Sequence, residues 1–267
     1  MKTNQYILLI LSALSFVACN DTEGVPFGDG YTDEALEHNW VLDVSVSDEF
    51  DNWNNSKWGT SLWYDVTSDF AFTSDNVYVK DGLLHLAAKK ESYNGKEYTC
   101  GAVISTTQLG NNTCVEIRAK TIDYRANVTT ALWLSDQPAV ENDPNVEIDI
   151  METLQAKNAP QNFTATVHYW ENGQDTALGW VSIDMPTGNL SDDFHVYKLI
   201  RLDNYIKMYI DDIAYWEFNT TNYQNVSYQD RYIILSVEGH AGAPVDEFLP
   251  SEFLIDYVRV FRTTNSN

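Results

Sequence analysis

Polar and apolar residues alternate along many short segments of this chain, and few segments show helical spacing. Ten segments combine alternation with β-branched residues: 76–79, 83–87, 102–106, 115–120, 146–150, 162–169, 197–201, 206–210, 232–237 and 253–261. Turn-forming pairs such as Asp81-Gly82 and Asp211-Asp212 separate many of them. Short strands divided by turn residues are typical of antiparallel sandwiches, so the pattern predicts an all-β fold.

The same pattern indicates a single large domain. No internal repeat or low-complexity block interrupts it, and residues 20–32 form the one linker-like stretch, rich in glycine and acidic residues. About 249 residues follow residue 18, a length that fits one large all-β domain or two smaller ones. We expect one domain over 36–267, preceded by a polar tether over 19–35.

Residues 1–18 have the features of an export signal. Lys2 provides a positive start, and 6–17 form a mostly apolar run that is too short to span a membrane as a mature helix. The run ends in Phe-Val-Ala-Cys, which resembles the lipobox of bacterial lipoproteins and predicts lipidation of Cys19. An ordinary signal that leaves a secreted protein is the alternative. We expect a cell-surface or outer-membrane lipoprotein, facing the extracellular space or periplasm.

The charge of the chain limits its partners. Sixteen Lys and Arg residues stand against 39 Asp and Glu residues, which gives a net charge of −23. This charge opposes binding to nucleic acid or to an anionic membrane surface, so we expect membrane contact only through the lipid anchor. A sulfated polyanion would need a local basic patch. We expect a monomer.

The mature chain retains two cysteines. Cys100 and Cys114 flank an apparent hairpin, and exported proteins can keep disulfides. The two cysteines could form a disulfide or remain two buried thiols, and the sequence does not decide between these because it does not fix the strand register. The His and Cys residues show no zinc-like spacing.

The segment 146–152, Val-Glu-Ile-Asp-Ile-Met-Glu, carries the strongest candidate chemistry. In a strand, positions 146, 148 and 150 point to one side, and Glu147 and Asp149 point to the other. Glu152 lies five positions after Glu147, so it shares their side only if a β-bulge near 150–151 absorbs one residue. With that bulge, all three carboxylates share one face.

Such a face suits glycoside hydrolysis. Two glutamate arms leaning inward bring their carboxyls to about 5–5.5 Å, the separation found in retaining enzymes. Repulsion between the carboxylates raises the pKa of at least one of them. That acid then keeps a proton, which it can give to the leaving glycosidic oxygen. An exposed acidic strand without catalysis is the alternative in a chain of this charge.

Together with other segments, this motif resembles glycoside hydrolase family 16. The segment 146–152 is similar to the bulged signature of laminarinases, agarases, porphyranases and carrageenases. Further segments match the family in the same order: 47–51, 57–58, 76–84, 98–106, 115–120, 130–134, 167–170 and 253–260. The resemblance covers nearly the whole mature chain. It implies a β-jelly-roll sandwich of two curved antiparallel sheets with an open concave cleft, and endo-acting, configuration-retaining cleavage.

The resemblance assigns roles to the acids. Glu147 would be the nucleophile, Glu152 the general acid and then base, and Asp149 the residue that orients the nucleophile. No cofactor is needed for this chemistry. Family members often hold a structural calcium on the convex face, where Glu49 and Asp256 would contribute ligands.

Four aromatic or imidazole rings are candidates for sugar binding. Trp133 occupies a position where the family keeps a cleft tryptophan, and alternation separates it from the leucines on either side; a core tryptophan is the alternative. His168 and Trp170 alternate onto one face of their strand, although a buried structural histidine is equally compatible with the sequence alone. Trp63 lies in the irregular stretch 61–73, which fits a loop at the cleft edge.

Two charged residues bear on the choice of glycan. Glu238 matches a position near the cleft in algal-galactan members, and Arg125 could receive a sulfate or be an ordinary surface charge. Laminarinase-like members usually carry Gly-Trp-Pro where 124–130 reads Tyr-Arg-Ala-Asn-Val-Thr-Thr. We therefore expect a red-algal galactan of the agarose or porphyran type. A laminarinase-like endo-β-glucanase, a transglycosylase and a non-catalytic surface glycan-binding lipoprotein are the alternatives.

Overall fold

The computed structural model describes residues 39–136, 144–186 and 188–263. The expected signal peptide, the lipidated Cys19 and the tether therefore lie outside the described residues. No helix within these ranges has both the length and the apolar character needed to cross a bilayer.

Two β-sheets build the described part of the chain. The larger sheet comprises β1 (Trp40–Leu42), β3 (Val66–Thr67), β4 (Phe70–Phe72), β5 (Val77–Lys80), β6 (Leu83–Lys89), β7 (Tyr98–Cys100), β9 (Thr113–Lys120), β14 (His195–Leu202), β15 (Tyr205–Ile210), β16 (Ile213–Asn219) and β18 (Ser251–Thr263). The smaller sheet comprises β2 (Trp58–Gly59), β8 (Ala102–Ser105), β10 (Thr129–Ser135), β11 (Asn145–Glu152), β12 (Asn162–Glu171), β13 (Gln174–Asp184) and β17 (Tyr232–Glu238). The helices are short: η3 (Ser74–Asn76), η4 (Tyr124–Ala126), α1 (Gln224–Tyr228) and η5 (Asp246–Phe248).

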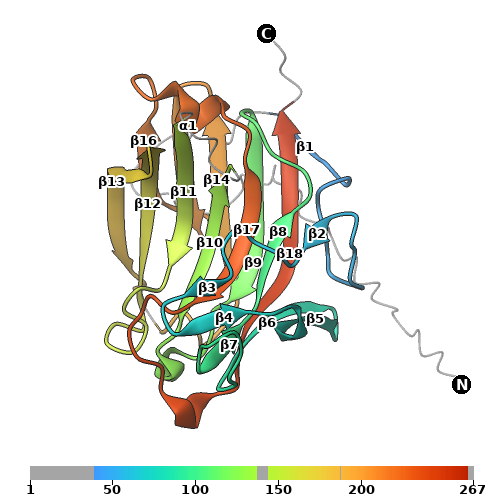
Figure 1. The fold of residues 1–267 in the computed structure, drawn as a ribbon. Helices are drawn as coiled ribbons and strands as arrows, with labels where there is room; N and C mark the ends of the chain where they lie inside the picture. Colours follow the sequence, from blue (N-terminus) through green and yellow to red (C-terminus); the bar gives the residue numbers. More distant parts are fainter. Residues whose placement is uncertain (1–38, 137–143, 187, 264–267) are drawn as a thin grey trace, which may run out of the picture.

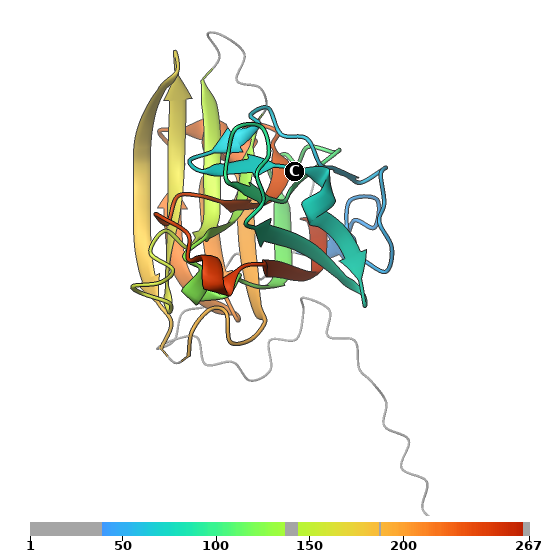
Figure 2. The same cartoon turned by 60° about the horizontal axis from the view of Figure 1, so that its bottom comes forward.

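The two sheets stack face to face as a sandwich (Figure 1; Figure 2). The smaller sheet runs in the order β13-β12-β11-β10-β17-β8-β2, with antiparallel neighbours throughout. One pair in the larger sheet, β4 with β7, is parallel. The predicted all-β jelly-roll sandwich is confirmed, with that pair as the exception to antiparallel order.

The core lies between the sheets. Val146, Ile148 and Ile150 of β11 are fully buried in it, as the alternation predicts. Leu132 and Leu134 of β10 join the same core. Burial of these aliphatic faces removes apolar surface from water, the main favourable contribution to folding. It also turns the opposite side of β10 and β11 away from the core.

A buried arginine fixes the beginning of β11. The Nε of Arg231 donates to the carbonyl oxygen of Val146 at 2.6 Å. Its other nitrogens donate to carbonyl oxygens of Asn225, Val226 and Gln229 around the C-terminal end of α1. The last carbonyls of a helix lack some of their intrahelical donors, and the Asn225 carbonyl has only the N–H of Gln229 besides Arg231, so this guanidinium supplements the end of α1 and ties it to β11.

The cysteine question is answered by the strand arrangement. Cys100 lies in β7 and Cys114 in β9, both buried, and no disulfide joins them. Burial raises the pKa of the Cys100 thiol well above its ordinary value. The alternative of two buried thiols is therefore the one that the structure supports.

Candidate active site

Two strand registers place Glu152 on the same side of the sheet as Asp149. Opposite residues of an antiparallel pair point to the same side, and positions two apart share a side. Asp149 lies opposite Trp133 and Glu152 opposite Ala131, two positions apart on β10. Across β12, the partners are Thr166 and Thr164, again two positions apart. The sequence spacing alone would have separated the two acids.

A β-bulge produces this arrangement. Between Asp149 and Glu152, β11 has two residues, Ile150 and Met151, where β12 has only Ala165. Both bulge side chains are fully buried in the core. Two successive apolar residues therefore enter the core, and the alternation changes phase between the acids. The predicted bulge and the predicted common face are confirmed.

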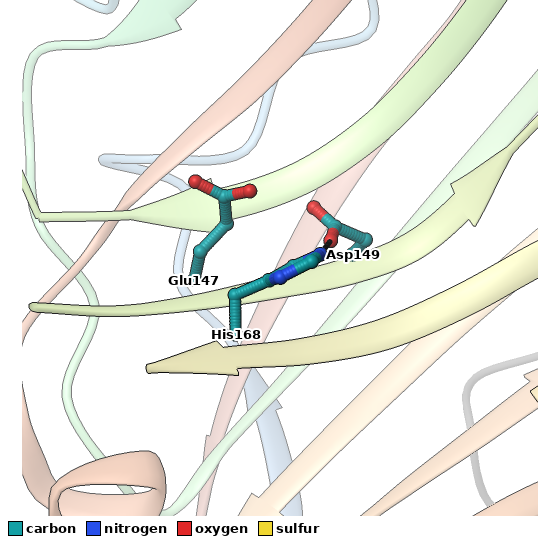
Figure 3. Close-up of side chains that lie close together, drawn as sticks. All are labelled: Glu147, Asp149 and His168. Atoms are coloured by element: carbon teal, nitrogen blue, oxygen red, sulfur yellow. Dashed lines mark ion pairs between the residues drawn. The ribbon is translucent and has the colours of Figure 1, made fainter. Parts of the chain in front are cut away.

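Figure 3 shows Glu147 and Asp149 on one strand with His168 beside them. His168 lies directly opposite Glu147 in the register of β11 and β12. Its Nε2 is 3.2 Å from Oδ2 of Asp149, and its Nδ1 is 2.9 Å from Oδ1 of Asp175. The imidazole is thus held between two carboxylates, with its ring turned toward the acid motif.

Burial and mutual repulsion alter the proton affinity of all three acids. Desolvation is the largest cause that raises the pKa of Glu147 and of Asp149 well above their ordinary values. The pKa of Glu152 is also raised, by desolvation and then by the charge of Glu238. His168 opposes the rise at Glu147 and Glu152. Repulsion between neighbouring carboxylates thus favours states in which the group keeps a proton.

A hydrogen-bonded network surrounds a fourth carboxylate. Glu238, on β17, is 5% exposed and accepts a bond from the hydroxyl of Ser236 at 2.6 Å. The Tyr64 hydroxyl donates to the same oxygen at 3.2 Å, and the Nε2 of His240 lies 2.9 Å from the other. The indole Nε1 of Trp133 donates to Ser236 at 3.0 Å. Bonding to Glu238 raises the pKa of His240.

Trp133 faces the acids rather than the core between the sheets. Its flanking leucines are in the main core, while it packs with Ala131 and Ile234 on the opposite side of the sheet. The ring of Trp63 meets it edge to face at a centroid separation of 5.4 Å. Trp63 remains 41% exposed and Trp133 only 5%, so Trp63 offers the open surface of the pair.

Trp170 lies on the same side of the sheet, as the sequence predicts. It is opposite Asn145, and its ring centroid is 6.3 Å from that of His168. Its indole Nε1 is buried and has no hydrogen-bond partner among the described residues. A buried N–H without an acceptor is unfavourable, which makes this atom a candidate donor to a ligand.

The remaining sequence candidates are engaged elsewhere. Arg125 binds Asp123 through its guanidinium and stacks over Phe248 at 4.7 Å. Glu49 forms a two-point bond with Arg259 at 2.8 and 2.9 Å, and Asp256 is bonded by Arg118. The roles of Arg125 in sulfate binding and of Glu49 and Asp256 in calcium binding stay predictions.

The described residues contain one group of three or more potential metal ligands, Glu147, Asp149 and His168, whose ligand atoms lie within 4.8 Å of one another. Carboxylates and imidazole are ordinary metal ligands, but they must be deprotonated to bind. Burial raises the pKa of both carboxyls here. A cation bound there would therefore compete with protons for these oxygens.

Three residues of this face were missed by the sequence prediction. Asp175 and His240 contact the predicted site residues directly. Trp180 of β13 is 67% exposed and lies opposite Thr166, which in turn lies opposite Asp149. Asp175 and Trp180 are five positions apart, so alternation along 174–184 would have put them on opposite faces. A register shift between β12 and β13, at Val167 and His168, brings both to the face of the acids.

Comparisons with known proteins find relatives in sequence and solved structures with the same fold. Glucan endo-1,3-beta-glucosidase A1 of Niallia circulans is 23% identical over an alignment of 285 positions. The alignment covers 91% of this chain but only 40% of that protein. The beta-glucanase of Rhodothermus marinus is 24% identical over an alignment of 282 positions, which covers 98% of this chain and 95% of the relative. The solved structure of beta-agarase A in complex with oligoagarose shares the fold with a TM-score of 0.71 at 20% identity, over 84% of this chain and 92% of that one.

A family model also matches most of the chain. The model described as Beta-porphyranase A-D, GH16 domain, matches residues 40–263, from β1 to the end of β18. That range includes the complete acid motif and both sheets. The chain belongs to glycoside hydrolase family 16.

Proposed function

We propose that this chain is a retaining endo-glycosidase that hydrolyses β-linkages within a polysaccharide. One observation carries the proposal: the bulge at Ile150 and Met151 turns Glu147, Asp149 and Glu152 to one face of the smaller sheet. A lectin does not need three neighbouring acids that repel one another, one buried and two half-buried, whereas a double-displacement glycosidase needs a nucleophile and an acid.

The reaction follows from the placement of these acids. Glu152 protonates the leaving glycosidic oxygen while the Glu147 carboxylate attacks the anomeric carbon, which gives a covalent glycosyl-enzyme. Glu152, now ionised, removes a proton from water, and the water displaces Glu147 with net retention. Asp149 and His168 orient the nucleophile. The carboxyl separation of about 5–5.5 Å that this route requires stays a prediction.

For the substrate, we propose a red-algal galactan of the porphyran or agarose type. The porphyranase description of the matching family model supports this choice, as does the absence of Gly-Trp-Pro before β10. The net charge of −23 favours a neutral or lightly sulfated chain. The exposed rings of Trp63 and Trp180 are suited to stacking on sugars.

An endo-β-glucanase is the second candidate, because two of the curated relatives are named glucan endo-1,3-beta-glucosidase A1 and beta-glucanase. Digestion of agarose, porphyran, κ-carrageenan, laminarin and mixed-linkage glucan, with products separated by size, distinguishes the two. We expect oligosaccharides of several lengths from one galactan and none from the glucans. Hydrolysis of laminarin alone would support the glucanase, and binding without any hydrolysis would support a glycan-binding protein.

For the cellular location, we propose a lipid-anchored protein on the outer membrane or cell surface, through Cys19. Metabolic labelling with a fatty-acid analogue tests this directly. We expect label on the full-length protein and none on Cys19→Ser, which should be released into the medium or periplasm.

Glu238→Gln is expected to move the alkaline limb of the pH profile of kcat/KM to lower pH. The Glu238 charge raises the pKa of Glu152, so its removal lowers that pKa and the acid loses its proton at lower pH. The measurement is hydrolysis of the identified glycan at a series of pH values. Glu97→Gln, at an exposed position, is the control and should leave the limb in place. An unmoved limb in Glu238→Gln would contradict the coupling.

Trp180→Ala is expected to raise KM for the polymer roughly 5- to 30-fold, the equivalent of 1–2 kcal/mol of lost stacking. Its effect on kcat should be small, because the ring lies two strands from the acids. Steady-state kinetics on the polymer tests this, with Tyr93→Ala as the control at another exposed aromatic residue, 46% accessible. An equal rise in both variants would exclude a specific role for Trp180.

A further inference from the structure

The bulge in β11 leaves one residue without a partner in either neighbouring strand. Met151 keeps a partner on β10, Leu132, but Ile150 is paired neither with β10 nor with β12. Carbonyl groups in a sheet normally point sideways to the adjacent strands. The Ile150 carbonyl, outside the regular pairing, is therefore placed to accept from a donor beyond the two strands, and a buried carbonyl without a donor is costly.

That donor comes from the opposite sheet. The hydroxyl of Tyr215, on β16, donates to the Ile150 carbonyl oxygen at 2.6 Å. Tyr215 is half-buried against the core, and desolvation raises the pKa of its phenol well above the ordinary value. Its ring is fixed edge to face against Phe163, with centroids 5.2 Å apart. The hydroxyl therefore has little freedom to leave the bulge.

We infer that Tyr215 is a positioning residue for catalysis, which acts by holding the bulge in the conformation that aligns Glu147 with Glu152. Ile150 stands between the two acids in sequence, one residue after Asp149 and two before Glu152. A rotation of its peptide group changes the direction of the strand between them. Small displacements of catalytic groups reduce rates strongly, while substrate-binding surfaces further away are little affected. The inference rests on the proposed function.

The chain offers a closely matched control. Tyr197, on β14, is fully buried in the core, whereas Tyr215 is half-buried, and the ring of Tyr197 also meets Phe163 edge to face, at 6.2 Å. Its hydroxyl, however, has no hydrogen-bond partner among the described residues. Tyr215→Phe and Tyr197→Phe thus remove the same atom from the same cluster, and only the first removes a bond to the bulge.

The experiment compares both variants with the wild type on the glycan identified by the digestion panel. In Tyr215→Phe, we expect kcat to fall by roughly 10-fold or more with KM changed less than about 2-fold. In Tyr197→Phe, both constants should stay near the wild-type values. Thermal unfolding is measured in parallel, and the kinetics are taken well below the lower midpoint. A folded Tyr215→Phe with wild-type kcat would overturn the inference.

A second variant tests whether the donor itself matters. Replacing Tyr215 with 4-aminophenylalanine keeps an N–H donor near the position of the hydroxyl, and kcat should return to within about 3-fold of the wild type. An equal loss in folded protein of this variant and of Tyr215→Phe would show that the bond is not responsible. Failure of the proposed function is distinguishable, because wild-type protein would then hydrolyse no glycan at all.

Discussion

Glu147→Gln is expected to lower kcat by at least about 10⁴-fold on the natural glycan, because an amide cannot form the covalent glycosyl-enzyme. The shape of the side chain is retained, and its partner across the sheet, His168, is unchanged. Hydrolysis is measured by the release of reducing ends over long incubations. Glu171→Gln, at an exposed position at the end of β12, is the control that should keep full activity.

The same variant is expected to unfold at a higher temperature at neutral pH. Burial raises the pKa of Glu147 in the folded chain, so the stability that its neutral form provides is complete below the unfolded pKa and is lost as pH rises through the folded value. Glutamine stays neutral, and the gain should therefore appear at pH 7 and vanish at about pH 4. Residual activity above a thousandth of the wild type, or a stability loss at pH 7, would contradict the assignment.

The acid motif was predictable because its information is local. Alternation at 146, 148 and 150 identifies the buried side, and the odd spacing of Glu147 and Glu152 then requires a bulge if both are to face the same way. The structure has that bulge at the expected residues. The ten alternating segments all lie within or overlap described strands for the same reason.

Edge strands were harder to predict. β13 and β16 lie at one end of their sheets, and most of their residues are exposed or half-buried, so alternation between apolar and polar residues is weak. Gly179 is an example of a residue whose reason lies in a tertiary contact and not in the pattern of its own strand. A Cβ at this position would lie 3.0 Å from the ring of Phe218, on β16, so its small size follows from a neighbour 39 positions away.

The network around Glu238 could not be predicted for a related reason. Its partner Tyr64 is 174 positions away in sequence and follows β2, which lies near β17 because both pair with β8. His240 is two positions away, but a histidine beside an acid is common on surfaces. The pairing of Tyr215 with Ile150 likewise joins two sheets, and no periodicity within either strand reports such a contact.

Glu152→Gln is expected to lower kcat on the natural glycan by about 10²–10⁴-fold, the usual contribution of a general acid. The size of the loss should depend on the leaving group. A nitrophenyl glycoside departs without protonation, so its first step should proceed almost normally and give a burst of nitrophenol. The glycosyl-enzyme then accumulates, because the variant lacks the base that activates water.

Azide distinguishes this role from a purely structural one. As a nucleophile that needs no base, it should accelerate turnover of the nitrophenyl substrate by Glu152→Gln and yield a glycosyl azide of retained configuration, while Glu147→Gln should give none of this product. The measurement is nitrophenol release with and without azide, together with the configuration of the product by NMR. If both substrates lost activity equally and azide had no effect, Glu152 would not be the acid. Its position beyond the bulge, opposite Ala131 and on the face of Asp149, would then serve substrate binding instead.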